Sequence, residues 1–192
     1  HGFLPHRPYP PDRIPERQRM TPAPVDPVGK LGLQTGDGRG VVGGWLCAGL
    51  GNDLGRRCGK AFDPALPVMR AQKDGVFAII SSMAGRTVGG LSGPMYTTTK
   101  HGVTALSHAI NVEECVNGIR SCAVQPGEVD TPMLAKRPKK LTPQELATVL
   151  KPEDVADVVR FVVETPKNVC LNEIWVTPTW NRGYVAALGR GS

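Results

Sequence analysis

Apolar and polar positions divide the chain into two parts of unlike character. From about Phe62 onward, apolar runs of strand length alternate with longer amphipathic segments, whereas the residues before it show no sustained period. The run GVFAIISS at 75–82 is almost continuously apolar, which is typical of a parallel strand covered on both faces. The runs at 119–127 (IRSCAVQPG) and 171–178 (LNEIWVTP) predict two further strands.

The longest segment between these runs predicts a helix over residues 95–117. Apolar residues recur there at roughly helical spacing, and an Asn-Gly pair at 117–118 is a typical helix end. The apolar positions on this predicted face are Val103, Leu106, Ile110 and Val116.

Residues 151–165 predict a second amphipathic helix. Pro152 lies in its first turn, acidic residues follow, and the valines at 155, 158, 159 and 162 fall on one side. Shorter helices are predicted over 62–73 and 142–150. Because strands that alternate with helices require crossover connections, we expect an α/β fold with a parallel sheet over residues 61–192.

The first 60 residues predict no such order. Residues 1–28 are rich in proline, which lacks a backbone N–H and fixes φ, so neither a regular helix nor a central strand is expected. Residues 31–59 are rich in glycine, and only VVGGWLCAGL at 41–50 is apolar enough to be buried. We expect residues 1–60 to form an irregular segment, disordered or loosely packed.

Charge and cysteine content narrow the function. The net charge of +6 would suit a nucleic-acid partner, but the basic residues are scattered and aromatic residues make up only 5%, so none is expected. A basic fold that handles a phosphorylated cofactor explains the charge as well. The five cysteines form no CxxC pair, and neither they nor the histidines have metal-ligand spacing, so we expect no metal site and a reducing, cytoplasmic setting. No apolar run is long enough for a membrane span. Because the chain begins with histidine, we expect a fragment or a processed form.

The stretch SSMAGRTVGGLSGPMYTTTKHG, residues 81–102, carries the candidate chemistry. Tyr96 and Lys100 lie one turn apart on the predicted helix, and an ammonium near a phenol lowers its pKa from about 10 toward the range useful for proton transfer. Ser82 ends the preceding strand, where ligands meet open α/β sheets, and its hydroxyl could hold a carbonyl oxygen beside the phenol. A YxxxK pair alone is common on helices. The order of strand, serine, glycine-rich loop, YxxxK and second strand favours the interconversion of a ketone and an alcohol.

These features resemble the short-chain dehydrogenase/reductase family, whose members are nicotinamide-dependent enzymes on a Rossmann-like parallel sheet. The resemblance extends over about residues 62–182 and rests on LPVMRAQKDGVFAIISSMAG, YTTTK, NGIRSCAVQPGEVDTPM, KPEDVADVVRFVVE and NEIWVTPTWNR. It implies that Ser82 orients the substrate carbonyl, that Tyr96 is the acid/base, and that Lys100 lowers the pKa of this tyrosine and binds the nicotinamide ribose.

The resemblance also implies a cofactor site and a substrate cover. Pro126 and Gly127 would shape the wall beside the nicotinamide. The backbone of Val129 and the hydroxyl of Thr131 would meet its carboxamide. With Tyr96 and Lys100, these residues complete the predicted cofactor site. Residues 133–146 would cover the substrate, so that Met133 and Leu134 line a pocket, although a solvated basic loop is an equal alternative for this segment.

The amino-terminal half departs from the family pattern. The expected phosphate-binding turn has its nearest match in TGDGRGVVGG, where Thr35, Gly36 and Gly40 fall in place but Val42 occupies the last glycine position. The preceding VGKLGLQ is a poor strand, and no NNAG sequence is present. We therefore expect an incomplete Rossmann-like fold whose amino-terminal βαβ cofactor unit is missing or degenerate. The composition of these residues would also suit a truncated gene or a wrong reading frame.

The sequence thus leads to one main hypothesis and two alternatives. The main hypothesis is an oxidoreductase that uses NAD or NADP and a small carbonyl or alcohol substrate through Ser82, Tyr96 and Lys100. The alternatives are a catalytically inactive remnant that acts only by association and a basic nucleic-acid-binding protein. The strand at 75–82 would lack a full parallel neighbour on its amino-terminal side, which exposes an edge and favours homo-oligomers.

Overall fold

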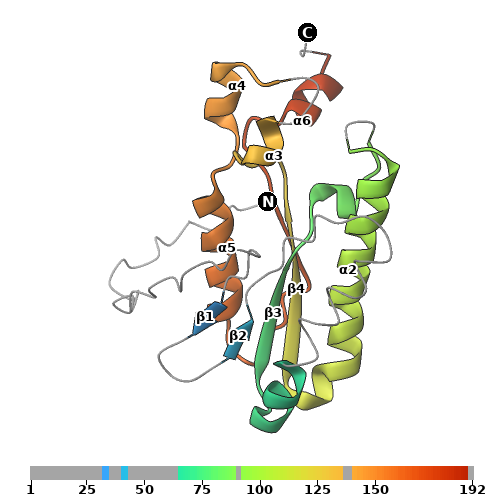
Figure 1. Cartoon of the computed structure of the whole chain (residues 1–192), viewed down its shortest axis with the longest axis vertical. Coiled ribbons are helices and arrows are strands. Elements are labelled where there is room, and N and C mark those ends of the chain that lie inside the picture. Colours follow the sequence, from blue (N-terminus) through green and yellow to red (C-terminus); the bar gives the residue numbers. More distant parts are fainter. Residues whose placement is uncertain (1–31, 35–39, 43–64, 90–91, 136–139, 190–192) are drawn as a thin grey trace, which may run out of the picture.

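The computed structural model describes residues 32–34, 40–42, 65–89, 92–135 and 140–189. Five strands form one sheet in the order β1-β2-β3-β4-β5 (Figure 1). Strands β2 to β5 run parallel, and only β1 pairs antiparallel with its neighbour. The strands are β1 (Gly32–Gln34), β2 (Gly40–Val42), β3 (Gly75–Ile80), β4 (Ile119–Pro126) and β5 (Glu173–Val176).

Helices cover both faces of the sheet. Helix α2 (Pro94–Glu114) lies on one face and α5 (Pro152–Glu164) on the other (Figure 1). The remaining helices include residues 65–72 and the short elements η2 (Met83–Gly85), η3 (Cys115–Asn117), α3 (Pro132–Ala135), α4 (Pro143–Thr148) and α6 (Arg182–Ala187). This arrangement confirms the expected Rossmann-like α/β fold.

Alternate residues of β3 enter two different cores, as the period of a strand requires. Val76 and Ala78 pack with Val159 and Val162 of α5. Phe77 and Ile79 pack in the other cluster, with Val103 and Ile110 of α2 and Met69 of helix 65–72. Burial on both faces explains why the sequence of β3 is apolar without alternation.

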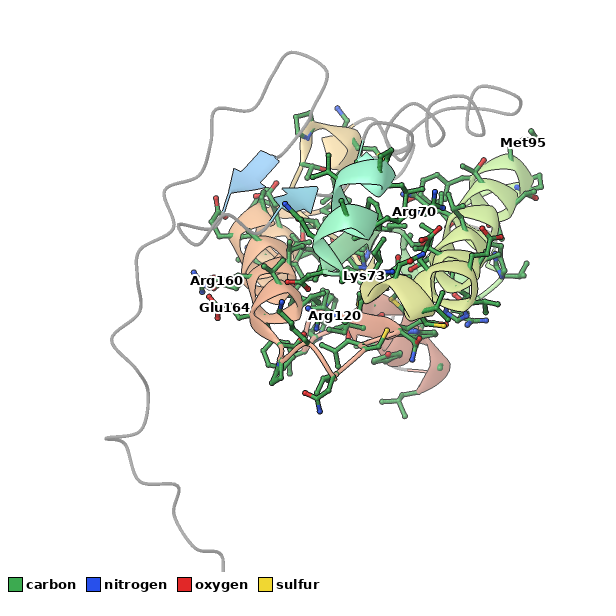
Figure 2. The ribbon with its side chains drawn as sticks, turned by 90° about the horizontal axis from the view of Figure 1, so that it is seen from below. Arg70, Lys73, Met95, Arg120, Arg160 and Glu164 are labelled. Carbon is green, nitrogen blue, oxygen red and sulfur yellow. The ribbon has the colours of Figure 1, made fainter. Side chains whose placement is uncertain are left out.

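Polar side chains fix the ends of the helices at the lower edge of the sheet. Arg70 donates from Nε to Oε2 of Glu114 at 3.0 Å, which ties helix 65–72 to the end of α2. Arg120 donates from one guanidinium nitrogen to the carbonyl oxygens of Pro166 and Val169, both at 2.8 Å. Figure 2 shows Arg70 and Arg120 at this edge, with Arg160 and Glu164 on the outer side of α5.

The predicted strands and helices are confirmed, with one correction. Val116 was expected on the buried face of the helix, but it is 80% exposed. Val116 lies six residues after Ile110, a spacing that does not return to the same helix face, and it belongs to η3 because α2 ends at Glu114.

Two short strands lie within the glycine-rich segment, where no regular structure was expected. Gly32–Gln34, part of the poor strand candidate, forms β1. Strand β2 pairs with β3 through Val41↔Val76 and Val42↔Phe77, so it covers part of the expected open edge. Gly40 begins this strand rather than preceding a helix, as a phosphate-binding turn would require. Thr35, Gly36 and the rest of residues 1–60 lie outside the described residues.

Within the described part of the chain, none of the helices combines the length and hydropathy that crossing a membrane requires.

Candidate active site

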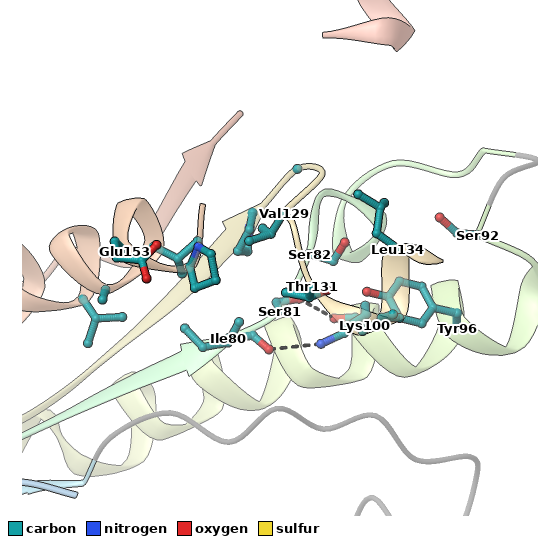
Figure 3. Close-up of a pocket in the computed structure, with 17 residues that line it drawn as sticks. Ile80, Ser81, Ser82, Ser92, Tyr96, Lys100, Val129, Thr131, Leu134 and Glu153 are labelled. Atoms are coloured by element: carbon teal, nitrogen blue, oxygen red, sulfur yellow. Dashed lines mark hydrogen bonds between the residues drawn. The ribbon is translucent and has the colours of Figure 1, made fainter. Parts of the chain in front are cut away.

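A cavity of about 500 Å³ opens at the carboxyl ends of β3 and β4. All seven residues predicted for the site line it (Figure 3). They are Ser82, Tyr96, Lys100, Pro126, Gly127, Val129 and Thr131. The parallel sheet explains this convergence, because the carboxyl ends of adjacent parallel strands meet at one edge.

Helix α2 begins just before the predicted tyrosine. Gly93 adopts a φ of 69° at the N-cap, and Pro94 occupies the first turn, where its missing N–H costs nothing. Tyr96 and Lys100 then lie on consecutive turns, with the Lys100 Nζ 5.7 Å from the centroid of the Tyr96 ring. The ammonium and the phenol therefore occupy one side of the helix, facing the cavity.

Lys100 is almost completely buried, at 2% exposure. Its Nζ donates a hydrogen bond to the carbonyl oxygen of Ile80 at 3.1 Å. Ile80 is the last residue of β3, so this bond joins the helix to the strand that delivers Ser82. A buried ammonium requires such partners, because desolvation of an unpaired charge is costly.

Ser82 follows β3 and caps η2. Its Oγ accepts a hydrogen bond from the backbone N–H of Ala84 at 3.2 Å. Since a hydroxyl carries one donor besides its acceptor lone pairs, Ser82 can still donate toward a ligand. In Figure 3 the hydroxyls of Ser82 and Tyr96 face the same cavity, near Thr131.

The turn after β4 forms the opposite wall. The backbone N–H of Gly127 donates to the carbonyl of Val176 at 2.8 Å, which carries the sheet one residue beyond Pro126. A Cβ at Gly127 would lie 3.1 Å from Cδ of Pro178, so a side chain there would crowd the wall. Glu128 then accepts hydrogen bonds from Arg182 and raises the pKa of its guanidinium, which fastens α6 over this turn.

A parallel bridge between Val129 and Leu150 closes the segment that follows. The Asp130 N–H donates to the Leu150 carbonyl at 2.8 Å, and the Leu150 N–H donates to the Glu128 carbonyl at 3.0 Å. In this bridge the N–H and C=O of Val129 itself point away from Leu150. The segment from Val129 to Leu150 therefore begins and ends at the same point of the core, and we call it the 129–150 segment. Met133 and Leu134 of this segment line the cavity, as the sequence predicted for these two residues.

Sequence reasoning missed several residues of the site. Ser81 and Ser92 add hydroxyls to the lining, Glu153 adds a carboxylate from the first turn of α5, and Val155 and Val159 add an apolar wall. The serine pair at the end of β3 was the available signal for Ser81, because polar residues at the carboxyl end of a buried parallel strand lie where ligands bind.

Comparison with known proteins finds similarity in the part of the chain that contains β3, α2 and β4. The family model of short chain dehydrogenases matches residues 60–142. Dehydrogenase/reductase SDR family member 11 of Homo sapiens is 37% identical over 114 residues, which cover 55% of this chain and 44% of the human protein. Glycine betaine reductase ATRR of Emericella nidulans is 37% identical over 119 residues, which cover 59% of this chain and 9% of that protein.

Solved structures share the fold. An alcohol dehydrogenase of the archaeon Thermococcus sibiricus, complexed with 5-hydroxy-NADP, superposes with a TM-score of 0.52 at 20% identity, over 80% of this chain and 65% of that one. The chain spans 44% of the human relative's length and a much smaller share of the fungal reductase. The residues matched by the family model include β3, α2 and β4, which line one side of the cavity, and end before α5.

Proposed function

Since this chain belongs to the short-chain dehydrogenase/reductase family and carries its carboxy-terminal part, we propose that it interconverts a small carbonyl compound and the corresponding alcohol with NAD or NADP. The observation that carries the proposal is the Lys100 ammonium 5.7 Å from the Tyr96 ring, in a cavity that the Ser82 hydroxyl also lines. This combination offers one proton donor and one hydrogen-bond donor to a single substrate oxygen.

The residues act on that oxygen in a defined order. Ser82 donates a hydrogen bond that holds the carbonyl oxygen and stabilises the negative charge that develops on it during reduction. Tyr96 donates its hydroxyl proton to the same oxygen, and the Lys100 ammonium stabilises the phenolate that remains. In oxidation the phenolate takes the alcohol proton back.

The cavity suits the nicotinamide end of the cofactor. When bound, a nicotinamide cofactor supplies the hydride that the carbonyl carbon gains, or accepts it in the reverse direction. Gly127 lines the cavity beside Pro126, Val129 directs its backbone N–H and C=O away from Leu150, and Thr131 offers a hydroxyl. The complex of the archaeal alcohol dehydrogenase with an NADP derivative further supports nicotinamide use.

The substitution Tyr96→Phe tests the assignment of the acid/base. Reduction of a panel of small aldehydes and ketones is measured with NADH and with NADPH, after each cofactor's binding has been followed by its fluorescence. We expect kcat to fall by about 10²- to 10⁴-fold, because that is the usual contribution of a positioned proton donor.

Tyr184→Phe is the matched control for this experiment. Tyr184 lies in α6, is 53% exposed and is outside the cavity lining, so its loss leaves kcat unchanged. Wild-type turnover by Tyr96→Phe would refute the role of Tyr96. Failure of the unaltered chain to bind either cofactor would refute the proposed function itself.

A further inference from the structure

We propose that Ser81 is a positioning residue that holds Lys100 in place beside Tyr96. The inference rests on the proposed function and deepens it, because it assigns a role to a buried hydroxyl that the proton-transfer scheme does not use. Ser81 lies between Ile80, which binds the ammonium, and Ser82, which faces the substrate side of the cavity.

Two consecutive residues, Ile80 and Ser81, hydrogen-bond to the side-chain ammonium and to the backbone carbonyl of Lys100. The Ser81 Oγ donates to the backbone carbonyl of Lys100 at 3.0 Å, while the Ile80 carbonyl accepts from the Lys100 Nζ at 3.1 Å (Figure 3). Ser81 is 3% exposed and Lys100 is 2% exposed, so water does not compete for these bonds. The position of the ammonium relative to β3 is thus fixed from both sides of the lysine.

The strand end itself is anchored in turn. The Ser81 N–H donates to the carbonyl of Val124 at 2.7 Å, which holds Ser81 against β4 beside the Pro-Gly turn. The sheet, the end of β3 and the helix that carries Tyr96 are therefore connected through one serine.

Thr104, one turn after Lys100 in the same helix, contacts both the Lys100 carbonyl and the Ser81 hydroxyl. Its Oγ1 lies 3.1 Å from the Lys100 carbonyl oxygen and 2.9 Å from the Ser81 Oγ. Because the Ser81 hydroxyl donates to the Lys100 carbonyl, the Thr104 hydroxyl donates either to the same carbonyl or to the Ser81 Oγ. Both contacts of this cluster that cross from the strand end to the helix involve the Ser81 Oγ, because Thr104 and Lys100 belong to the same helix.

Gly85 closes the space above this cluster. A Cβ at Gly85 would lie 2.5 Å from the Ser81 Oγ, 2.7 Å from the Thr104 Oγ1 and 2.8 Å from the Lys100 carbonyl oxygen. Contacts shorter than 3.0 Å to all three partners show that the turn is packed directly on them. The cluster cannot rearrange without moving η2, which carries the Ser82 cap.

The experiment compares Ser81→Ala with Ser107→Ala. Ser107 is a matched control, because it is a fully buried serine of α2, the helix that carries Lys100. Its hydroxyl pairs with the Ser121 hydroxyl at 2.8 Å rather than with Lys100. Both variants lose a buried hydroxyl that links α2 to the sheet. We expect kcat for carbonyl reduction to fall at least about tenfold in Ser81→Ala, with KM changed less than about twofold, since misplacement of a catalytic group acts on the transition state. Ser107→Ala is expected to keep kcat at a similar loss of stability.

Thr104 supplies a second pair of variants. Thr104→Ser keeps the hydroxyl and is expected to keep kcat, while Thr104→Val removes it and lowers kcat by less than Ser81→Ala does, because the link between strand and helix survives. Equal kcat losses in Ser81→Ala and Ser107→Ala, or unchanged kcat in Ser81→Ala, would overturn the proposal.

A readout without turnover separates this inference from the proposed function. The chain has three tyrosines, so ring-labelled tyrosine gives few NMR signals, and Tyr96→Phe assigns the one of interest. Ser81→Ala is expected to shift the Tyr96 ring signal, because the nearby ammonium moves, whereas Ser107→Ala leaves it in place. An unchanged Tyr96 signal in Ser81→Ala would refute the positioning role even in a chain without measurable activity.

Discussion

Gly118 makes the turn that delivers the chain from η3 into β4. Its φ of 72° lies in the left-handed region, and a Cβ there would lie 2.3 Å from the carbonyl oxygen of Lys73. Lys73 itself has a positive φ of 52°, so two unusual backbone conformations meet at this point. The register of β4 against β3 begins next to it, at Gly75↔Ile119.

We therefore expect Gly118→Ala to destabilise the protein strongly. The strain of a left-handed alanine costs about 1 kcal/mol, and the clash with a backbone carbonyl adds more, for a total of roughly 2–4 kcal/mol. Gly189→Ala is the control, because Gly189 has a similar φ of 67° with open space around it and should show the strain alone. Urea unfolding measures both, and equal losses in the two variants would contradict the clash.

The site residues that the sequence predicted are those whose proximity depends on their spacing along one helix. Tyr96 and Lys100 share a helix face because four residues make about one turn, and this holds whatever surrounds the helix. Ser81 was not assigned, because its partner is a backbone carbonyl 19 residues away that the sequence does not mark. Glu153 was missed for a different reason, because acidic residues are common in the first turn of any helix and do not mark a site.

Glu173 joins several elements on the face of the sheet that α2 covers. Its carboxylate accepts hydrogen bonds from Arg86, with Nε at 2.9 Å, and from Gln125 of β4 at 2.7 Å. The Nε2 of His108 on α2 lies 2.8 Å from the other carboxylate oxygen. The hydrogen bond from Arg86 is the main reason that the pKa of Glu173 falls to about 2.

This lowered pKa makes the stabilisation by Glu173 depend on pH. The ionised form is favoured in the folded state, so its contribution is complete above the ordinary pKa of 4.5 and is lost as the pH falls toward about 2. We expect the difference in unfolding free energy between wild type and Glu173→Gln to shrink steadily over this range. Chemical denaturation at pH 6, 4 and 3 measures it, and a difference independent of pH would contradict the assignment.

At the level of elements, the carboxy-terminal part could be read from sequence because its periods are strong. Val155, Val159 and Val162 mark the inner side of α5 without reference to the rest of the fold. β1 and β2 could not be read, because glycine has low strand propensity and their pairing depends on the free edge of β3. Val116 was placed wrongly because its spacing from Ile110 does not match a helical face.

The molecule as a whole exposes apolar surface at its outer strand. β5 is the last strand of the sheet order, and Trp175 within it is 46% exposed. At the other side, the described residues of β2 pair with two of the six residues of β3. Unpaired edges and exposed aromatic side chains both favour association.

We expect the chain to self-associate in solution. Light scattering coupled to gel filtration should give a mass above the 20.5 kDa of one chain that rises with concentration. Trp175→Lys should shift the mass toward one chain, because a lysine on an edge strand opposes pairing. Phe161→Lys places the same charge on the exposed side of α5 and is the control. A constant mass of one chain at every concentration would contradict this expectation.

The bridge between Val129 and Leu150 has a consequence for substitutions in the segment that it closes. The bridge joins the two ends of the 129–150 segment, and Lys151, the next residue, forms an ion pair with Asp130 at 2.8 Å. We therefore expect that substitutions within the segment leave the strands in place. Met133 and Leu134 line the cavity from this segment, whereas Tyr96 and Lys100 line it from α2. We therefore expect that exchange of this segment changes which molecules the cavity admits while Tyr96 and Lys100 keep their positions on α2.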